Sequence, residues 1–189
     1  MTQPTRYTKT AIALHWLIAL LIVAAFPLGL VMSDMALSPL KLKLVSYHKW
    51  LGVSVFLLVV ARLAWRVGHT PPPLPATIPL WQRRAAHGLH HLLYLLLFAI
   101  PLSGWLMSSA KGFQTVYLGV LPLPDLIGKD KMLGDALREV HETLNYILLT
   151  LVVLHVGAAL KHHFVDRNSI LARMLPFLDK QKISKENHP

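Results

Sequence analysis

Histidines are the residues of this sequence whose number and placement point to chemistry. The chain has 189 residues and 11 histidines, although 54% of its residues are hydrophobic and only 15% are charged. Four histidines lie within or at the ends of long apolar stretches: His15, His48, His141 and His155. A polar side chain inside such a stretch is costly and usually functional, and imidazole both ligates metals and transfers protons. The chain has no cysteine, which excludes iron–sulfur clusters, cysteine zinc sites and thioether-linked haem.

Four apolar stretches must position these histidines. They run approximately over Thr10–Met32, Val45–Trp65, Leu89–Met107 and Val140–Leu160. Each approaches the roughly 20 residues that a helix needs to cross the hydrocarbon core of a bilayer. The pattern predicts an all-α integral membrane protein with a four-helix bundle. The Pro-rich segment Gly68–Pro79 predicts a non-helical linker, and Ser108–Glu139 predicts the longest loop.

The uneven distribution of positive charge predicts the orientation of these spans. Of the 19 Lys and Arg residues, 12 belong to the side that holds both termini and the connection between the second and third spans. The others lie on the opposite side: Lys41, Lys43, Lys49, Lys111, Lys129, Lys131 and Arg138. Because Lys and Arg accumulate on the cytoplasmic side, we expect both termini in the cytoplasm. The net charge of +10 does not indicate nucleic-acid binding, since too little polar surface accompanies it.

The direction of each span sorts the four histidines into two layers. His141 and His155 are fourteen residues apart in the fourth span, so they share one helix face with an axial separation of about 21 Å. The first span begins inside, and the second and fourth begin outside. This predicts an inner pair, His15 with His155, and an outer pair, His48 with His141.

Two facing imidazoles between helices are typical of a bis-histidine haem site. The two layers therefore predict two non-covalent b-type haems bound between the helices, each iron held by one pair. Zinc is disfavoured, because it needs three or four ligands at one depth and each layer offers two. An interhelical hydrogen bond is the alternative for any single histidine. A histidine-bearing membrane scaffold without redox chemistry is the alternative for the whole chain.

Further histidines gather at the inner boundary of the third and fourth spans. They are His87, His90, His91, His162 and His163. One interpretation is solvated imidazoles facing lipid headgroups. The other is a quinone pocket, in which a histidine donates to a quinone carbonyl and passes a proton. His162 follows His155 by two helical turns and is the first quinone candidate, with His87, His90 and Arg62 as further candidates.

Several motifs resemble the bacterial cytochrome b561 family of four-helix, di-haem inner-membrane proteins. They are ALHW around His15, SYHKWLG around His48, AIPLSG with Pro101 and Gly104, VHETL around His141, LHVGAAL around His155, and KHHF. The resemblance covers about Thr8 to Pro176. It implies haem ligands at His15, His48, His141 and His155, and it also matches His87, His90 and His162 to family histidines, but not His91. We expect residues 1–176 to form one transmembrane cytochrome b domain, followed by a polar basic cytoplasmic tail over 177–189.

The resemblance also implies a superoxide:ubiquinone oxidoreductase in the bacterial inner membrane. Such an enzyme oxidises periplasmic superoxide to oxygen and reduces ubiquinone, with membrane lipid around it. The basic residues of the outer side favour attraction of a small anion. The loop between the third and fourth spans does not match the family residue by residue, so the sequence assigns no superoxide site there. The alternative is an electron-carrier or anchor subunit that passes electrons between quinone and a redox partner protein.

Overall fold

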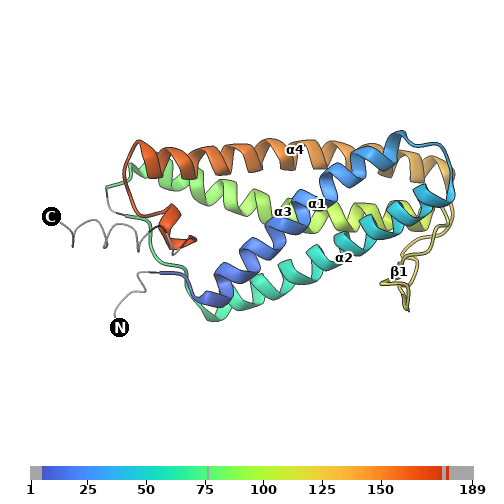
Figure 1. Ribbon diagram of the computed structural model, residues 1–189, viewed down its shortest axis with the longest axis horizontal. Helices are drawn as coiled ribbons and strands as arrows, with labels where there is room; N and C mark the ends of the chain where they lie inside the picture. Colours follow the sequence, from blue (N-terminus) through green and yellow to red (C-terminus); the bar gives the residue numbers. More distant parts are fainter. Residues whose placement is uncertain (1–5, 76, 176–177, 179–189) are drawn as a thin grey trace.

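Four long helices form the protein, which is described by a computed structural model over residues 6–75, 77–175 and 178 (Figure 1). They are α1 (Lys9–Asp34), α2 (Pro39–Gly68), α3 (Leu80–Ala110) and α4 (Lys131–Phe164). A short antiparallel hairpin, β1 (Val116–Tyr117) paired with β2 (Leu121–Pro122), lies between α3 and α4. A 3₁₀ turn, η1 (Leu171–Arg173), follows α4. The predicted four-helix architecture is confirmed. The expected tail over 177–189 lies outside the described residues, apart from Leu178.

Three of the helices begin at a polar N-cap residue. These residues, and not the ends of the apolar stretches, determine where the helices begin. The side chains of Thr8, Ser38 and Asp130 accept hydrogen bonds from the backbone N–H groups of Ala11, Lys41 and Leu133. Consequently α2 begins at Pro39 rather than near Val45, and α4 begins at Lys131 rather than near Val140. The predicted loop Ser108–Glu139 was therefore too long, and the helix-to-helix connection is 111–130. The non-helical Pro-rich linker after α2 is confirmed.

The helices pack as two antiparallel pairs with limited contact between them. Helix α1 packs on α2, α3 packs on α4, and α2 joins the two pairs through α3. Two small clusters of buried residues hold the middle of the bundle: Ile18 with Val55 and Val59, and Leu96 with Ile100 and Leu148. Within the described residues, α4 makes much less backbone contact with α1 and α2 than with α3. Side chains bridge this wider spacing, as Phe26 of α1 and Tyr146 of α4 do with ring centres 6.2 Å apart.

The β-hairpin folds back against α2 at the end of the bundle opposite the two ends of the described chain (Figure 1). Trp50 Nε1 donates to the Val116 carbonyl at 2.7 Å, and the hydroxyls of Ser54 and Tyr117 are 2.9 Å apart. At the turn, Leu118 and Gly119 have φ angles of +53° and +75°. Gly119 suits this left-handed backbone because it has no Cβ, whereas Leu118 occupies it with strain. The sequence predicted a loop here, not this docked hairpin.

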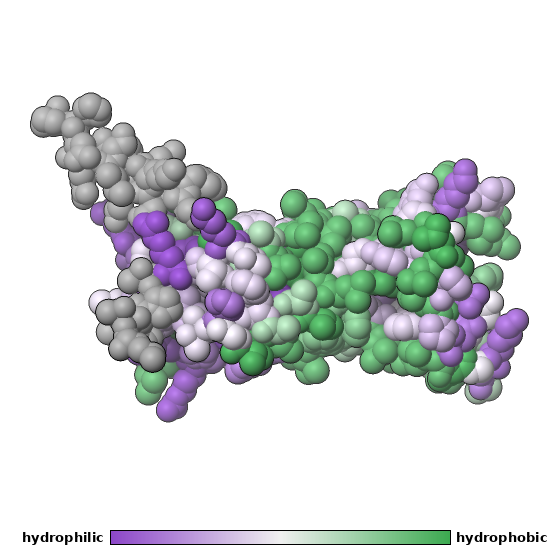
Figure 2. All heavy atoms as spheres, turned by 90° about the horizontal axis from the view of Figure 1, so that it is seen from below, coloured by the Kyte–Doolittle hydropathy of each residue, from purple (hydrophilic) through white to green (hydrophobic). Residues whose placement is uncertain are grey.

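The outer surface of the bundle is a broad apolar belt between two polar ends (Figure 2). All four helices are long and apolar enough to cross a membrane. In α1 and α4 only 6% of the most apolar window is buried within the protein. Large side chains such as Leu20, Val23 and Val153 are more than half exposed. Exposure of so much apolar surface to water is unfavourable, so the belt is the part of the protein that faces lipid.

Labelling of single cysteines should place the two polar ends on opposite sides of the membrane. The native chain has no cysteine, so Arg84→Cys and Lys129→Cys give unique thiols at the inner and outer ends. The positive-charge bias predicts that a membrane-impermeant maleimide labels Lys129→Cys in intact cells and labels Arg84→Cys only after the membrane is opened. Equal labelling of both positions in intact cells would contradict the arrangement, and the reverse order would invert the orientation.

Candidate functional site

Two pairs of histidines face each other across the space between the helices. The ring centres of His15 on α1 and His155 on α4 are 6.2 Å apart, and their planes are inclined by 64°. The ring centres of His48 on α2 and His141 on α4 are also 6.2 Å apart, with planes inclined by 81°. The structure therefore brings together the same two pairs that the helical period predicted. Each pair joins α4 to a helix with which it makes little backbone contact.

The spacing within each pair fits one metal atom between two imidazole nitrogens. Two metal–nitrogen bonds of about 2 Å, with roughly 1 Å from each nitrogen to its ring centre, give about 6 Å between ring centres. In the part of the chain that the structure describes, no cluster of three or more His, Asp or Glu side chains is arranged to hold a metal ion. A pair of protein nitrogens is therefore suited to a metal whose other ligands come from a planar macrocycle, as in haem.

Backbone carbonyls fix the orientation of the outer pair. His48 Nδ1 lies 3.1 Å from the Ala25 carbonyl, and His141 Nδ1 lies 3.0 Å from the Ile100 carbonyl and 3.0 Å from Ser103 Oγ. Because a carbonyl oxygen only accepts, each Nδ1 carries the proton and each Nε2 keeps its lone pair for a metal. Metal-ligating histidines commonly donate their second N–H in this way.

Two glycines make room for the outer rings. A Cβ on Gly29 would lie 3.1 Å from the His48 ring, and a Cβ on Gly104 would lie 3.0 Å from the His141 ring. Beside this pair is a groove of about 60 Å³ that is open to the outside. Its wall includes Gly52, where an added Cβ would meet nothing within 4 Å. The facing histidines, the glycines beside them and the groove together suit a flat cofactor.

A third histidine joins the inner pair. The His90 ring on α3 stands edge-on to His155 with ring centres 5.2 Å apart, and its Nδ1 lies 2.5 Å from the Ala86 carbonyl. Arg62 on α2 is close enough to act electrostatically on His15, His90 and His155. In the described residues, neither His15 nor His155 has a hydrogen bond like those of the outer rings. The two sites thus have different surroundings.

The remaining inner histidines are more peripheral. His162 Nδ1 lies 2.7 Å from Asp166 Oδ2, and Lys161 Nζ donates to the same oxygen at 2.8 Å. These hydrogen bonds, that from Lys161 first, hold the pKa of the Asp166 carboxyl below its usual range. His87 and His91 are exposed at the surface of α3, and His163 contacts Phe164. His162 is the one with a built polar environment, and its side chain is only 16% exposed.

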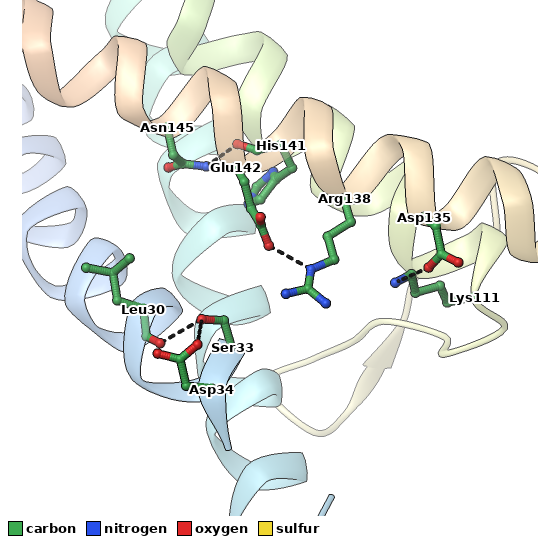
Figure 3. Close-up of polar contacts among 9 residues, drawn as sticks. All are labelled: Leu30, Ser33, Asp34, Lys111, Asp135, Arg138, His141, Glu142 and Asn145. Atoms are coloured by element: carbon green, nitrogen blue, oxygen red, sulfur yellow. Dashed lines mark hydrogen bonds and ion pairs between the residues drawn. The ribbon is translucent and has the colours of Figure 1, made fainter. Parts of the chain in front are cut away.

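At the outer end, acidic partners offset part of the positive charge. Figure 3 shows the ion pairs Arg138–Glu142 and Lys111–Asp135, at 2.7 Å and 3.0 Å, on the same end of α4 as His141. Lys41 and Lys49 instead donate to the backbone carbonyls of Met35 and Phe113, and the ion pairs of the described residues include neither lysine. The outer end therefore keeps a partial positive character.

Sequence reasoning missed several groups that shape the sites. Ser103, Gly29 and the acceptor carbonyls of Ala25 and Ile100 had no distinguishing signal, because each becomes relevant only through its place opposite a ring. Gly104 was noted as part of a motif but not as the residue that admits His141. The contact of His90 with His155 could have been anticipated, since both lie near the inner ends of spans that adjoin in the bundle.

Known proteins share this pattern over nearly the whole chain. Residues 6–177 match the prokaryotic cytochrome b561 family. The chain is 37% identical to cytochrome b561 homolog 2 of Escherichia coli (strain K12) over 174 residues, which cover 91% of this chain and 92% of that protein. It is 31% identical to cytochrome b561 homolog 1 of the same organism over 181 residues, covering 90% and 97%. It is 28% identical over 179 residues to a probable superoxide oxidase CybB of Yersinia pestis, covering 90% and 96%.

The family explains the combination of a lipid-facing belt and facing histidines, because its members are cytochromes with b-type haem. The resemblance found in the sequence motifs is confirmed by the match over residues 6–177. With four helices that can cross a membrane, this chain is a multi-pass membrane cytochrome and belongs to the prokaryotic cytochrome b561 family.

Proposed function

We propose that this membrane cytochrome holds two haem b groups and carries electrons from the outer to the inner side of the bilayer. His48 and His141 hold the outer haem, and His15 and His155 hold the inner one. The observation that carries the proposal is the repetition of the same 6.2 Å ring spacing at two depths along α4. Haem iron supplies one-electron chemistry without taking up or releasing protons at the histidines. The transmembrane domain is proposed to span residues 1–176, with residues 177–189 as a cytoplasmic tail.

We further propose that the electron donor is superoxide. Two superoxide anions give up one electron each and leave as two molecules of oxygen. The lysines of the outer end, including Lys41, Lys43 and Lys131, raise the local concentration of a small anion there. Direct binding of superoxide to iron would not be needed, because His48 and His141 would hold the outer haem from both sides and the electron could enter through the edge of the haem. The similarity to a probable superoxide oxidase supports this choice of donor.

The electron acceptor is proposed to be ubiquinone, bound at the inner end near His162. Ubiquinone takes up two electrons and two protons to become the quinol, so its site must reach water. His162 lies two helical turns, about 10 Å, beyond His155 on nearly the same face of α4. Its Nδ1 faces Asp166, so the imidazolium form of the ring can donate its Nε2–H to a quinone carbonyl and pass that proton on. His87, His90 and Arg62 were the other quinone candidates, and His90 and Arg62 lie closer to the inner pair.

Haem content should separate the two histidine pairs. Purified wild-type protein should yield two extractable haems per chain in a pyridine haemochrome assay. His15→Ala or His155→Ala should remove mainly one centre, and His48→Ala or His141→Ala mainly the other, because each iron loses one of its two axial ligands. Redox titration followed by absorption identifies which centre is lost. One haem per wild-type chain, or loss of the same centre in His15→Ala and His141→Ala, would contradict the pairing.

Superoxide oxidation should proceed with the purified protein alone and should be sensitive to salt. Haem reduction by superoxide should slow severalfold between about 0.01 M and 0.1 M salt, as the screening length falls from about 30 Å to about 10 Å. The double variant Lys43→Gln/Lys131→Gln should have a slower rate and a weaker salt dependence, while the double variant Arg84→Gln/Arg167→Gln at the inner end, which also removes two positive charges, serves as the control. A protein that is reducible but never turns over superoxide with ubiquinone would instead favour the electron-carrier subunit.

Replacement of His162 should impair quinone reduction without changing either haem. His162→Ala is expected to lower the steady-state rate about tenfold or more, because a positioned proton donor is removed. Asp166→Asn should have a smaller effect in the same direction. Since the pKa of Asp166 is lowered, its contribution is present at neutral pH and is lost only as the pH falls through that lowered value. His163→Ala is the matched control. Equal rates for His162→Ala and wild type would remove His162 from the quinone site.

A further inference from the structure

The positively charged side chain of Arg62 points into the helix bundle. Its Nη1 donates to the Ala11 carbonyl of α1 at 2.6 Å, and its Nε donates to the Tyr94 hydroxyl of α3 at 3.0 Å. A long side chain near the end of a span can snorkel outward to headgroups. Arg62 does not, because both contacts draw its guanidinium across α2 toward the two neighbouring helices. Ala11 lies one helical turn from His15, which brings the charge beside the inner histidine pair.

A second arginine lies on the same face of α2. Arg66 follows Arg62 by one helical turn, and its guanidinium carbon lies 6.0 Å from the centre of the Tyr94 ring. One arginine therefore contacts the hydroxyl of Tyr94 and the other lies over its ring. Two positive charges at this spacing on one helix repel each other. Negative charge nearby would therefore stabilise their arrangement.

The described part of the chain offers little such charge at this end. In residues 6–75, 77–175 and 178, the acidic residue on the inner side is Asp166, and it is already bound to Lys161 and His162. The ion pairs of the described residues do not include Arg62 or Arg66. A guanidinium inside a membrane bundle without a counter-ion is strongly unfavourable. Its position next to His15 and His155 indicates that the missing anion belongs to whatever these histidines bind.

We propose that Arg62, with Arg66, binds the carboxylate groups of the inner haem. This inference rests on the proposed haem function. A haem b carries two carboxylates. Each of the two guanidiniums on this face of α2 can donate a pair of parallel N–H···O hydrogen bonds to one carboxylate. Tyr94 is a positioning residue, since its hydroxyl holds the Nε of Arg62. The role differs from the quinone contact expected for Arg62 from the sequence.

The arrangement also assigns different reduction potentials to the two haems. Positive charge beside a haem favours the reduced form, which carries one more negative charge. At the outer site the two rings donate Nδ1–H to carbonyls, which makes them more basic ligands and favours the oxidised iron. The inner rings lack such bonds among the described residues and have Arg62 nearby. Both effects make the inner haem the better electron acceptor.

Redox titration of Arg62 variants tests the proposal without any turnover. In Arg62→Gln, the reduction equilibrium of one haem should shift at least tenfold toward the oxidised form, about 59 mV for a one-electron centre. The same centre should be the one removed by His15→Ala. Arg62→Lys keeps the charge but not the fork, so its shift should be smaller. Tyr94→Phe should give a small shift of the same sign.

The exposed Arg84→Gln at the inner end is the matched control, and both potentials should stay at their wild-type values. If Arg62→Gln loses the inner haem altogether while Arg62→Lys keeps it, the result supports a carboxylate contact. Unchanged potentials in a two-haem Arg62→Gln protein would overturn the proposal, as would a rise in the KM for quinone without any potential shift. Absence of haem from the wild-type protein would instead refute the proposed function itself.

Discussion

The distance of 6.2 Å between the ring centres of each facing histidine pair is the constraint on which the rest of the bundle depends. Both pairs reach from α4 to helices with which it makes little backbone contact, since the main packing is of α1 on α2 and of α3 on α4. Side chains such as Phe26 and Tyr146 meet across this spacing without drawing the helices closer together. The buried clusters around Val59 and Leu148 lie between the two depths and hold the pairs of helices at this distance. The spacing of the histidine pairs is thus suited to a flat cofactor held between two rings.

The two depths are built from the same ligand type but not from the same surroundings. At the outer site, carbonyls of α1 and α3 fix the rings of His48 and His141, and Gly29 and Gly104 allow those rings to approach the backbone. At the inner site, charged and aromatic groups surround the rings, namely Arg62, Tyr94 and His90. In the proposed two-haem cytochrome, these unequal surroundings would favour electron transfer toward the inner site, because a nearby guanidinium and weaker ligand hydrogen bonding both favour reduction there.

Much of this could be predicted from the sequence, and what could not has an identifiable cause. The pairing of His15 with His155 and of His48 with His141 follows from helix direction and the 3.6-residue period, which are local properties. The predicted starts of α2 and α4 were too late, since these helices follow the polar caps Ser38 and Asp130 and do not begin where the apolar stretches begin. The docking of Tyr117 on Ser54 depends on how a loop folds back in space, and no local pattern encodes it. Whether Arg62 turns outward or inward likewise depends on Ala11 and Tyr94, which belong to two other helices.

Acidic residues are distributed unequally between the two ends of the protein. Asp34, Asp125, Asp130, Asp135, Glu139 and Glu142 all lie at the outer end, where they offset basic residues that would otherwise repel one another. Inner cations lack this compensation in the described chain, since Asp166 is engaged by Lys161 and His162. An uncompensated charge in a low-dielectric bundle is costly, and a bound group of opposite sign lowers that cost. The carboxylates of the proposed inner haem would supply this balance at the inner end, whereas carboxylates of the protein itself offset much of the positive charge at the outer end, which keeps a partial positive character. Loss of cofactor should for this reason destabilise the inner half of the bundle more than the outer half, although the two histidine pairs have the same spacing.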